Sequence, residues 1–225
     1  MSSSVAYLQC RCGACTITLV DTEMRARTEC LCFDCRQRGL ISASKNPENA
    51  LPEAVANFER GVDLAYFTNL LIVDESSQEL LEFSKLTPEG SNTTAMSSCC
   101  GTLMCGTHPL YDGNTISVNA DSCRVNIRSV IPVEAIVFAC DAPDEKAALI
   151  TEKSSVPVIF DVFSSLENPV MQSFIGAVTA AVPKDTKLAD TTNFDELCAS
   201  KSVTINNDCY AESRAGKMVK PDRDD

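Results

Sequence analysis

Cysteine is the residue type in this chain that is best suited to chemistry, because its thiolates are strong ligands for soft metal ions. The sequence holds 13 cysteines, and six of them form two copies of the pattern Cys-x-Cys-x-x-Cys: Cys10, Cys12 and Cys15, then Cys30, Cys32 and Cys35. Two adjacent cysteines, Cys99 and Cys100, stand further along the chain. Thiols so close in sequence can ligate one ion, whereas a disulfide between them would be strained. The spacing therefore predicts two zinc sites.

The second triplet can bind a metal ion from one short loop. Cys30, Cys32 and Cys35 can occupy one face of a tetrahedron and leave the fourth position exchangeable, as in catalytic zinc sites. Three thiolates make zinc a poor activator of water, so a substrate thiol is a better fourth ligand, and its bond to an aldehyde carbon could then be made or broken. Arg36 can donate to a thiolate or a substrate carboxylate, or be a solvated surface residue. His108, the only histidine, is either a turn residue or a general base.

The first triplet requires further metal ligands from elsewhere in the chain. Cys10 and Cys12 form a bidentate pair, and Gly13 after them permits a tight backbone turn. A structural zinc needs two further ligands, and Cys99 and Cys100 are the expected donors. Such a site would join the N-terminal hairpin to the middle of the chain and contribute on the order of 10 kcal/mol of apparent folding free energy.

Composition narrows the classes of function. The 225 residues suit one domain with an elaborate tail, and 44% of them are hydrophobic. The net charge of −12 and the absence of Trp exclude a nucleic-acid binder, which needs a basic face or aromatic platforms. No secretory signal and no membrane-spanning apolar run is visible, so we expect no membrane association. An odd number of cysteines without an export signal favours reduced thiols and a cytoplasmic location.

Short β-branched and apolar runs separated by turn residues dominate the first 140 residues. We expect strands at 15–20, 64–67, 70–73, 80–83, 115–120 and 135–139, and about one helical turn each at 37–50 and 52–56. This pattern predicts a mainly β fold of antiparallel sheets over residues 5–145. The pattern changes after about Asp141, where we expect a helix from Ala142, a strand at 157–163 and a helix at 169–182. Residues 146–212 are expected to form a mixed or helical extension. The charged tail, 213–225, is expected to be disordered.

Four motifs in this order resemble the glutathione-dependent formaldehyde-activating enzyme family, which includes centromere protein V. They are Cys10-x-Cys12-Gly13, Cys30-x-Cys32-x-x-Cys35-Arg36, Cys100-Gly101-Thr102 and Ile116-Ser117-Val118-Asn119-Ala120. The resemblance covers roughly residues 8 to 140. It implies a zinc-pinned β-tent fold with a structural zinc and a second, solvent-accessible catalytic zinc. The implied structural ligands are Cys10, Cys12, Cys99 and Cys100, and the implied catalytic ligands are Cys30, Cys32 and Cys35.

The late cysteine pair departs from the family pattern. The family usually has Cys-x-x-Cys-Gly, which would place its first cysteine at Ser97, whereas here Cys99 adjoins Cys100. Two adjacent residues ligate one ion only with a cramped backbone, so Cys15 or Cys105 is an alternative fourth ligand. Otherwise we expect Cys15 and Cys105 in the core, as we do the remaining mid-chain cysteines, Cys123 and Cys140.

Two functions follow from the resemblance. The first is a carbon–sulfur lyase that joins or separates an aldehyde such as formaldehyde and a glutathione-like thiol, through an S-hydroxymethyl adduct. The second is a non-enzymatic, zinc-stabilised binding or scaffold module. Both leave room for a homo-oligomer. Glutathione is anionic, and five arginines in or near the cysteine segments can offset the negative net charge: Arg11, Arg25, Arg27, Arg36 and Arg38.

Overall fold

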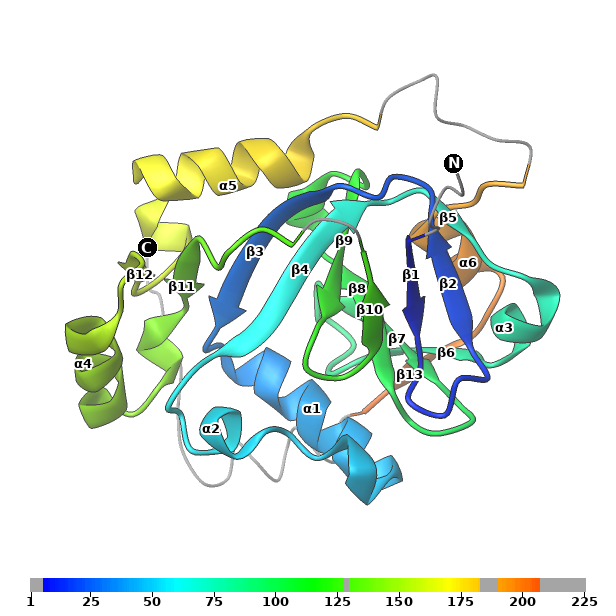
Figure 1. The fold of residues 1–225 in the computed structure, drawn as a ribbon, viewed down its shortest axis with the longest axis horizontal. Helices are drawn as coiled ribbons and strands as arrows, with labels where there is room; N and C mark the ends of the chain where they lie inside the picture. Colours follow the sequence, from blue (N-terminus) through cyan, green and yellow to red (C-terminus); the bar gives the residue numbers. More distant parts are fainter. Residues whose placement is uncertain (1–5, 128–129, 183–189, 207–225) are drawn as a thin grey trace.

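Two β-sheets organise the molecule. The computed structural model describes residues 6–127, 130–182 and 190–206. Its sheets have four strands, in the order β10-β1-β2-β5, and nine strands, in the order β12-β11-β3-β4-β9-β8-β7-β6-β13. Figure 1 shows the small sheet beside the large one, with α5 along the top and α1 along the bottom. The expected mainly β fold is confirmed, with one antiparallel sheet and one mixed sheet.

The small sheet begins with a hairpin that carries the first cysteines. Its strands are β1 (Ala6–Gln9), β2 (Thr16–Leu19), β5 (Leu71–Ile72) and β10 (Arg124–Asn126), and all its pairs are antiparallel. Buried and half-buried residues alternate along β1 and β2, as expected where one face of a strand packs on the core. Leu8 and Ile17 pair across the hairpin and lie in the same apolar cluster as Cys10.

The centre of the large sheet is antiparallel. Its six strands are β3 (Met24–Cys30), β4 (Val62–Thr68), β9 (Thr115–Asn119), β8 (Leu103–Thr107), β7 (Thr93–Ser97) and β6 (Leu81–Lys85). Strand β4 is buried at every position except Asp63, because side chains pack on both of its faces. The antiparallel pairing of β3 with β4 runs as far as Cys30 opposite Val62, and this pairing places the start of the second cysteine triplet.

Helices connect the strands and pack around the large sheet. They are α1 (Phe33–Lys45), α2 (Glu53–Ala56), α3 (Glu75–Glu79), α4 (Asp144–Lys153), α5 (Pro169–Thr179) and α6 (Phe194–Ala199), with 3-10 turns at Pro47–Asn49, Pro109–Tyr111, Ala139–Asp141 and Phe163–Ser165. The expectation of a single turn at 37–50 was wrong, since α1 is a 13-residue helix that starts at Phe33. Its sequence is largely polar, so its length depends on the cap at Cys32 and on tertiary packing.

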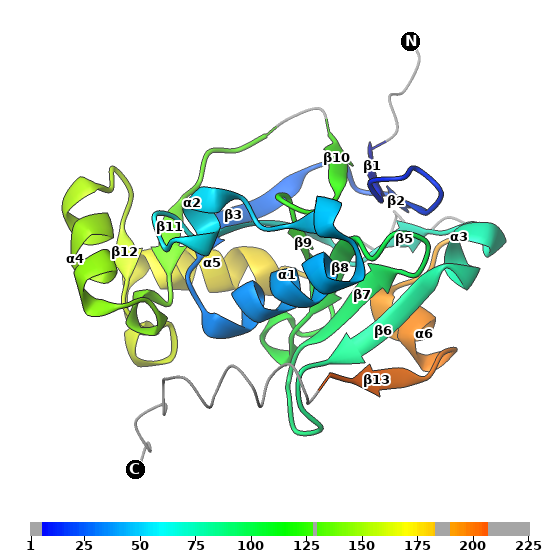
Figure 2. The same cartoon turned by 90° about the horizontal axis from the view of Figure 1, so that it is seen from below.

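Residues after 134 add parallel strands to both edges of the large sheet. Strands β11 (Ala135–Val137) and β12 (Val158–Ile159) extend it beyond β3, and β13 (Val203–Ile205) pairs with β6 at the other edge. The strand expected at 157–163 is therefore only two residues long. Seen from below in Figure 2, α1 lies in front of the sheet, with α4 and β12 at one end and α6 and β13 at the other. The tail at 213–225 lies outside the described residues.

Two large apolar clusters divide the core, and each includes cysteines of one motif region. One cluster packs the small sheet against β6, β8 and β9 and includes Cys10 and Cys15. The other packs β3, β4 and β11 against α5 and includes Cys30, with Cys32 and Cys35 at its edge. In the described part of the chain, every helix is too short or too polar to cross a membrane.

Candidate metal centres

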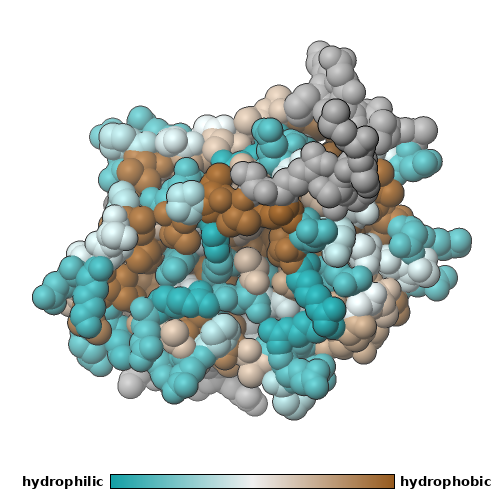
Figure 3. Space-filling view, viewed as in Figure 1, coloured by the Kyte–Doolittle hydropathy of each residue, from teal (hydrophilic) through white to brown (hydrophobic). Residues whose placement is uncertain are grey.

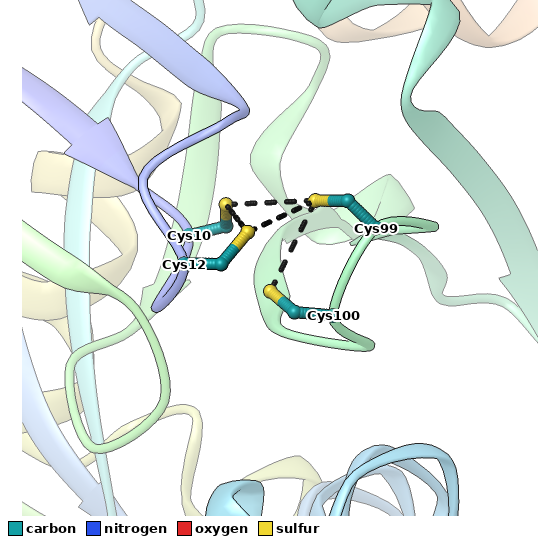
Figure 4. A group of neighbouring side chains, drawn as sticks. All are labelled: Cys10, Cys12, Cys99 and Cys100. Atoms are coloured by element: carbon teal, nitrogen blue, oxygen red, sulfur yellow. Dashed lines mark hydrogen bonds between the residues drawn. The ribbon is translucent and has the colours of Figure 1, made fainter.

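Four thiols from two distant turns meet at one point. Cys10 and Cys12 lie in the β1–β2 turn, and Cys99 and Cys100 lie in the β7–β8 turn. Figure 4 shows the two turns facing each other with all four side chains directed inward. The four Sγ atoms lie within 4.8 Å of one another. The shorter separations from Cys99 Sγ are 3.7 Å to Cys10 Sγ and 3.4 Å to Cys12 Sγ. We refer to these residues as the four-cysteine group.

This spacing fits a tetrahedral metal ion. A zinc ion with Zn–S bonds of about 2.3 Å holds its sulfurs about 3.8 Å apart. The S–S separations are 3.5 Å for Cys10 and Cys12 and 4.0 Å for Cys99 and Cys100, close to that value and well beyond a disulfide bond. All four cysteines are free thiols. The donor set can therefore hold one soft divalent ion with every position filled by protein.

Glycines and backbone hydrogen bonds shape both turns. Gly13 has φ of +86° and Gly101 has φ of +68°, which favour glycine at these positions. In the first turn, the Cys15 amide donates to Cys10 Sγ at 3.3 Å. In the second, the Gly101 amide donates to the Ser97 carbonyl at 2.8 Å. Adjacent cysteines thus reach the same point because the turn tightens at the next residue.

The alternative fourth ligands lie elsewhere. Cys15 is buried, and its thiol donates to the Ser77 carbonyl at 3.6 Å. Cys105 is buried on β8, and neither residue belongs to the four-cysteine group. Cys123 is also buried, as expected, whereas Cys140 is only half-buried. Ser97, which stands where the family has a cysteine, places its Oγ 3.4 Å from Cys100 Sγ.

The adjacent thiols Cys99 and Cys100 differ in how readily they ionise. Burial opposes ionisation of Cys100, but hydrogen bonds from the Ser97 and Thr102 hydroxyls outweigh it and lower the pKa of Cys100 to about 5. Burial and then the neighbouring thiols of Cys12 and Cys10 raise the pKa of Cys99 to about 12. Without a cation Cys100 therefore ionises far more readily than Cys99, and a divalent ion would favour the thiolate form of both.

The second triplet forms a separate group of three thiols. The Sγ atoms of Cys30, Cys32 and Cys35 lie within 4.8 Å of one another, and no other His, Cys, Asp or Glu of the described residues belongs to this group. Cys30 ends β3, Cys32 is the N-cap of α1, and Cys35 lies in the first helical turn. The expected single loop is thus a strand-to-helix junction. We refer to these residues as the cysteine trio.

The negative charge of the trio is favoured on Cys35, in the first turn of α1, since the pKa values of Cys30 and Cys32 are both raised. The Cys35 amide donates to Cys32 Sγ at 3.3 Å, and the helix dipole stabilises anions at this end. Hydrogen bonds with Cys32 and Cys35, followed by burial, raise the pKa of Cys30 well above its ordinary value. Hydrogen bonds from Cys30 and Cys32, and the positive charge of Arg38, hold the pKa of Cys35 well below it. The trio is less exposed than expected, since Cys30 is buried and Cys32 and Cys35 are half-buried.

Arg36 does not make the contact that we expected with a thiolate or with open solvent. Its terminal nitrogens donate to the backbone carbonyls of Val55 and Ala56, the latter at 2.7 Å. The guanidinium also stacks on the ring of Phe58, with 3.4 Å from Cζ to the ring centroid. Burial lowers the pKa of Arg36 to about 10, and the nearby Cys32 opposes this shift. Arg36 therefore joins α1 to the end of α2.

His108 is a capping residue. Its Nδ1 accepts a hydrogen bond from the Leu110 amide at 3.0 Å at the start of a 3-10 turn. Burial and then Arg38 lower the pKa of His108, so the ring is neutral at neutral pH with its proton on Nε2. Because the Nδ1 lone pair is already used, His108 cannot act as a general base through that atom.

Two residues that we did not single out position the trio. Gly61 packs so closely on the end of β3 that a Cβ there would lie 2.7 Å from the backbone nitrogen of Cys30. Asp141 accepts a hydrogen bond from the first amide of α1, at Phe33, at 2.9 Å. A glycine just before a strand is a weak signal for the first contact, and no local pattern indicates the second.

A small cavity reaches the trio. Its volume is about 60 Å³, and its lining includes Cys35, Arg38, Asn92 and Tyr111. Burial raises the pKa of Tyr111 above its ordinary value, so its hydroxyl stays protonated. The four-cysteine group has no residue in this lining. The trio is thus the group that a small molecule can approach through a preformed space.

Comparison with models of known protein families gave no match, and no curated protein matches this sequence.

Proposed function

We propose that the protein is a zinc-dependent carbon–sulfur lyase-like enzyme that makes or breaks the adduct of a glutathione-like thiol with an aldehyde such as formaldehyde. The observation that carries the proposal is the cysteine trio, which offers three thiols beside a cavity. Three protein ligands leave one position of a tetrahedral ion for an exchangeable ligand. The four-cysteine group offers a complete set and would hold a structural zinc.

The order of the cysteine motifs supports placing the chain with the formaldehyde-activating enzyme family and its zinc-pinned β-tent fold. The two sheets and the ligand sets are consistent with that assignment. The Cys99–Cys100 pair would then be a variant of the usual Cys-x-x-Cys, made workable by the turn at Gly101.

The reaction needs no oxidant. The thiol sulfur forms a bond to the aldehyde carbon, the carbon–oxygen double bond becomes a single bond, and the thiol proton ends on the oxygen. The reverse reaction breaks the carbon–sulfur bond and returns the proton to the sulfur. A zinc ion held by the trio would supply a Lewis acid that lowers the pKa of the substrate thiol.

The chain's own groups would orient the substrate and handle its proton. The trio at the start of α1 would hold the reacting sulfur at the mouth of the cavity. Tyr111 lines the cavity and keeps its proton, so its Oη can donate a hydrogen bond to the oxygen of the aldehyde or of the adduct. Its ring packs edge-on against Tyr66 at 5.7 Å, which fixes its orientation.

The test combines metal content with the rate of adduct exchange. We expect about two zinc ions per chain by elemental mass spectrometry, and acceleration of glutathione–formaldehyde exchange in two-dimensional exchange NMR. Cys32→Ser should abolish the acceleration and leave a folded protein with one zinc. Cys198→Ser, which changes a half-buried cysteine outside both groups, is the matched control. Full activity of Cys32→Ser would disprove the proposal.

The alternative is a zinc-stabilised binding module. Large apolar side chains that are strongly exposed favour it, among them Phe160 and Val130, each 59% exposed. On the face shown in Figure 3, brown apolar side chains gather mostly in the upper half, between teal polar ones. This alternative predicts that both ions are inert to added thiols and that glutathione–formaldehyde exchange proceeds at its uncatalysed rate.

A further inference from the structure

The cavity beside the trio contains a buried cation that the proposed reaction does not use. Arg38 lines the cavity and lies on α1 one turn after Cys35. It is only 6% exposed, and its Nε, fully shielded from solvent, has no hydrogen-bond partner among the described residues. A guanidinium buried in this way is strongly destabilising unless an anion or a hydrogen-bond acceptor joins it.

The other arginines near the cysteines are already engaged. Arg11 donates to the carbonyls of Asp121 and Ser122. Arg25 donates to two threonine hydroxyls, and Arg27 pairs with Asp63 at 2.6 Å. Arg36 donates to the end of α2. Among the five arginines expected to form a basic patch, Arg38 is thus the one that lines this cavity and has a buried donor without a partner in the described chain.

The described surroundings offer Arg38 little negative charge. The ion pairs of the described side chains are Arg27–Asp63, Lys45–Glu82 and Arg60–Asp121. Arg38 lies near Cys35 and near His108, whose ring is neutral. The trio can share one negative charge with it, but a thiolate does not match the planar, multiple-donor shape of a guanidinium as a carboxylate does.

The same cavity contains an unpartnered acceptor. Asn92 lines it, and its Oδ1 is buried without a hydrogen-bond partner in the described structure. A buried donor at Arg38 and a buried acceptor at Asn92 are both costly when left unpaired. A ligand with a carboxylate for Arg38 and an N–H or O–H group for Asn92 would satisfy both.

We infer that this cavity is a carboxylate subsite, and that the substrate thiol, or the adduct made from it, carries a carboxylate that binds Arg38. The inference rests on the proposed function only in taking the sulfur to bind at the trio. Residues three apart on a helix have Cβ atoms about 5–6 Å apart, so the carboxylate should lie a few bonds from the sulfur. A cavity of about 60 Å³ accommodates such a group and excludes a whole tripeptide, whose remainder must lie outside.

The first experiment tests the subsite without a thiol. Propionate and its neutral analogue propionamide are titrated into the ¹⁵N-labelled, zinc-loaded full chain, and amide shifts of cavity residues are followed by NMR. We expect propionate to bind at least tenfold more tightly than propionamide. Arg38→Met, which keeps the length of the side chain, should remove this preference, and Arg38→Lys should keep part of it. Lys45→Met, at the exposed end of the same helix, is the control for general charge.

The second experiment adds the sulfur. Binding of 3-mercaptopropionate and of 3-mercaptopropanol is compared by calorimetry in the same variants. We expect 3-mercaptopropionate to bind the natural protein about tenfold more tightly than 3-mercaptopropanol does. In Arg38→Met the two thiols should bind equally, because the affinity for 3-mercaptopropanol should not change. If both thiols bind the natural protein equally, the subsite is refuted and the proposed function stands. If propionate binds at Arg38 but neither thiol binds, the subsite stands and the proposed function fails.

One further outcome would overturn the inference. Arg38 could serve only to balance the charge of the trio. Arg38→Met would then weaken zinc binding at the trio and leave the carboxylate preference of both ligand pairs intact. Zinc retention, measured by elemental mass spectrometry on the same samples, separates these two roles.

Discussion

The two cysteine groups are assembled in opposite ways. The four-cysteine group joins two turns, with Cys99 87 residues from Cys12 and 89 from Cys10. The trio comes from a short segment in which a strand ends and a helix begins. An ion in the first group closes a long loop of chain, so its binding energy becomes folding energy. An ion in the second group is held by residues that are already neighbours, so its binding energy is available for a ligand.

Judged by exposure alone, the four-cysteine group would be the site open to a ligand, and the trio would be the structural site. Cys12 and Cys99 are exposed, whereas Cys30 is buried and Cys32 and Cys35 are half-buried. The number of protein ligands and the adjoining cavity distinguish the two groups better than surface area does. A complete set of four thiols has no free position, and an incomplete set beside a cavity has one.

Removing a ligand from the four-cysteine group should have the largest effect. Cys10→Ala leaves three thiols to hold two separate turns, and we expect loss of one metal ion and of several kcal/mol, approaching the ~10 kcal/mol of a structural zinc. Thermal unfolding and metal content measure both. Cys15→Ala removes a buried thiol of the same turn that lies outside the group, and should cost only about 1–2 kcal/mol with no loss of metal. Similar losses in the two variants would contradict the structural role.

The second-largest effect is expected at the trio, from a change in backbone packing. Gly61→Ala places a Cβ 2.7 Å from the Cys30 nitrogen, which must move the end of β3. We expect a loss of about 1–3 kcal/mol in unfolding free energy and selective loss of the trio's metal ion. Gly176→Ala on α5 meets nothing within 4 Å and is the matched control, expected to be neutral or stabilising. Retention of both ions in Gly61→Ala would show that the trio tolerates this shift.

Arg36 distinguishes a positioning role from a direct role at the trio. Arg36→Ala removes two hydrogen bonds to the end of α2 and the stacking on Phe58, and should cost about 2 kcal/mol of stability. Because its donors bind the end of α2 and Arg36 does not line the cavity, we expect KM for the thiol to change little at a temperature where the variant is folded. A large rise in KM with unchanged stability would instead restore the substrate-binding role expected from the sequence.

The smallest expected difference is in the rates at which the two cysteine groups release their metal ions to a chelator. A chelator should remove the trio's ion at least tenfold faster than the ion of the four-cysteine group, since an exchangeable position lets the chelator attack before a thiolate leaves. Release followed with a chromogenic zinc indicator should therefore be biphasic. The fast phase should disappear in Cys32→Ser. A single phase in the natural protein would mean that both ions are equally closed.

Much of the local structure could be predicted from sequence. Alternating apolar residues located β2, and apolar runs bounded by turns located β4, β6, β9 and β11 to within a few residues. Strand β3 was missed and helix α1 was expected only as a single turn, because their residues are largely polar and their order depends on neighbours. The two-residue β12 lies inside the strand expected at 157–163, whereas the late β13 was not predictable, since it is defined by pairing with a distant strand.

The sequence by itself determined which thiols can share an ion when they lie close together, because spacing in a short segment sets the reach of its side chains. It therefore identified both triplets as candidate ligand sets, and only the tertiary structure showed that Cys35 joins its triplet whereas Cys15 is buried outside the four-cysteine group. Only the tertiary structure decided that Cys99 joins the first two cysteines of the first triplet, since this contact depends on how two turns nearly ninety residues apart approach each other. Only the tertiary structure turned Arg36 toward α2 and left the buried Arg38 facing a cavity, because helix packing rather than sequence order selects the partner of each guanidinium.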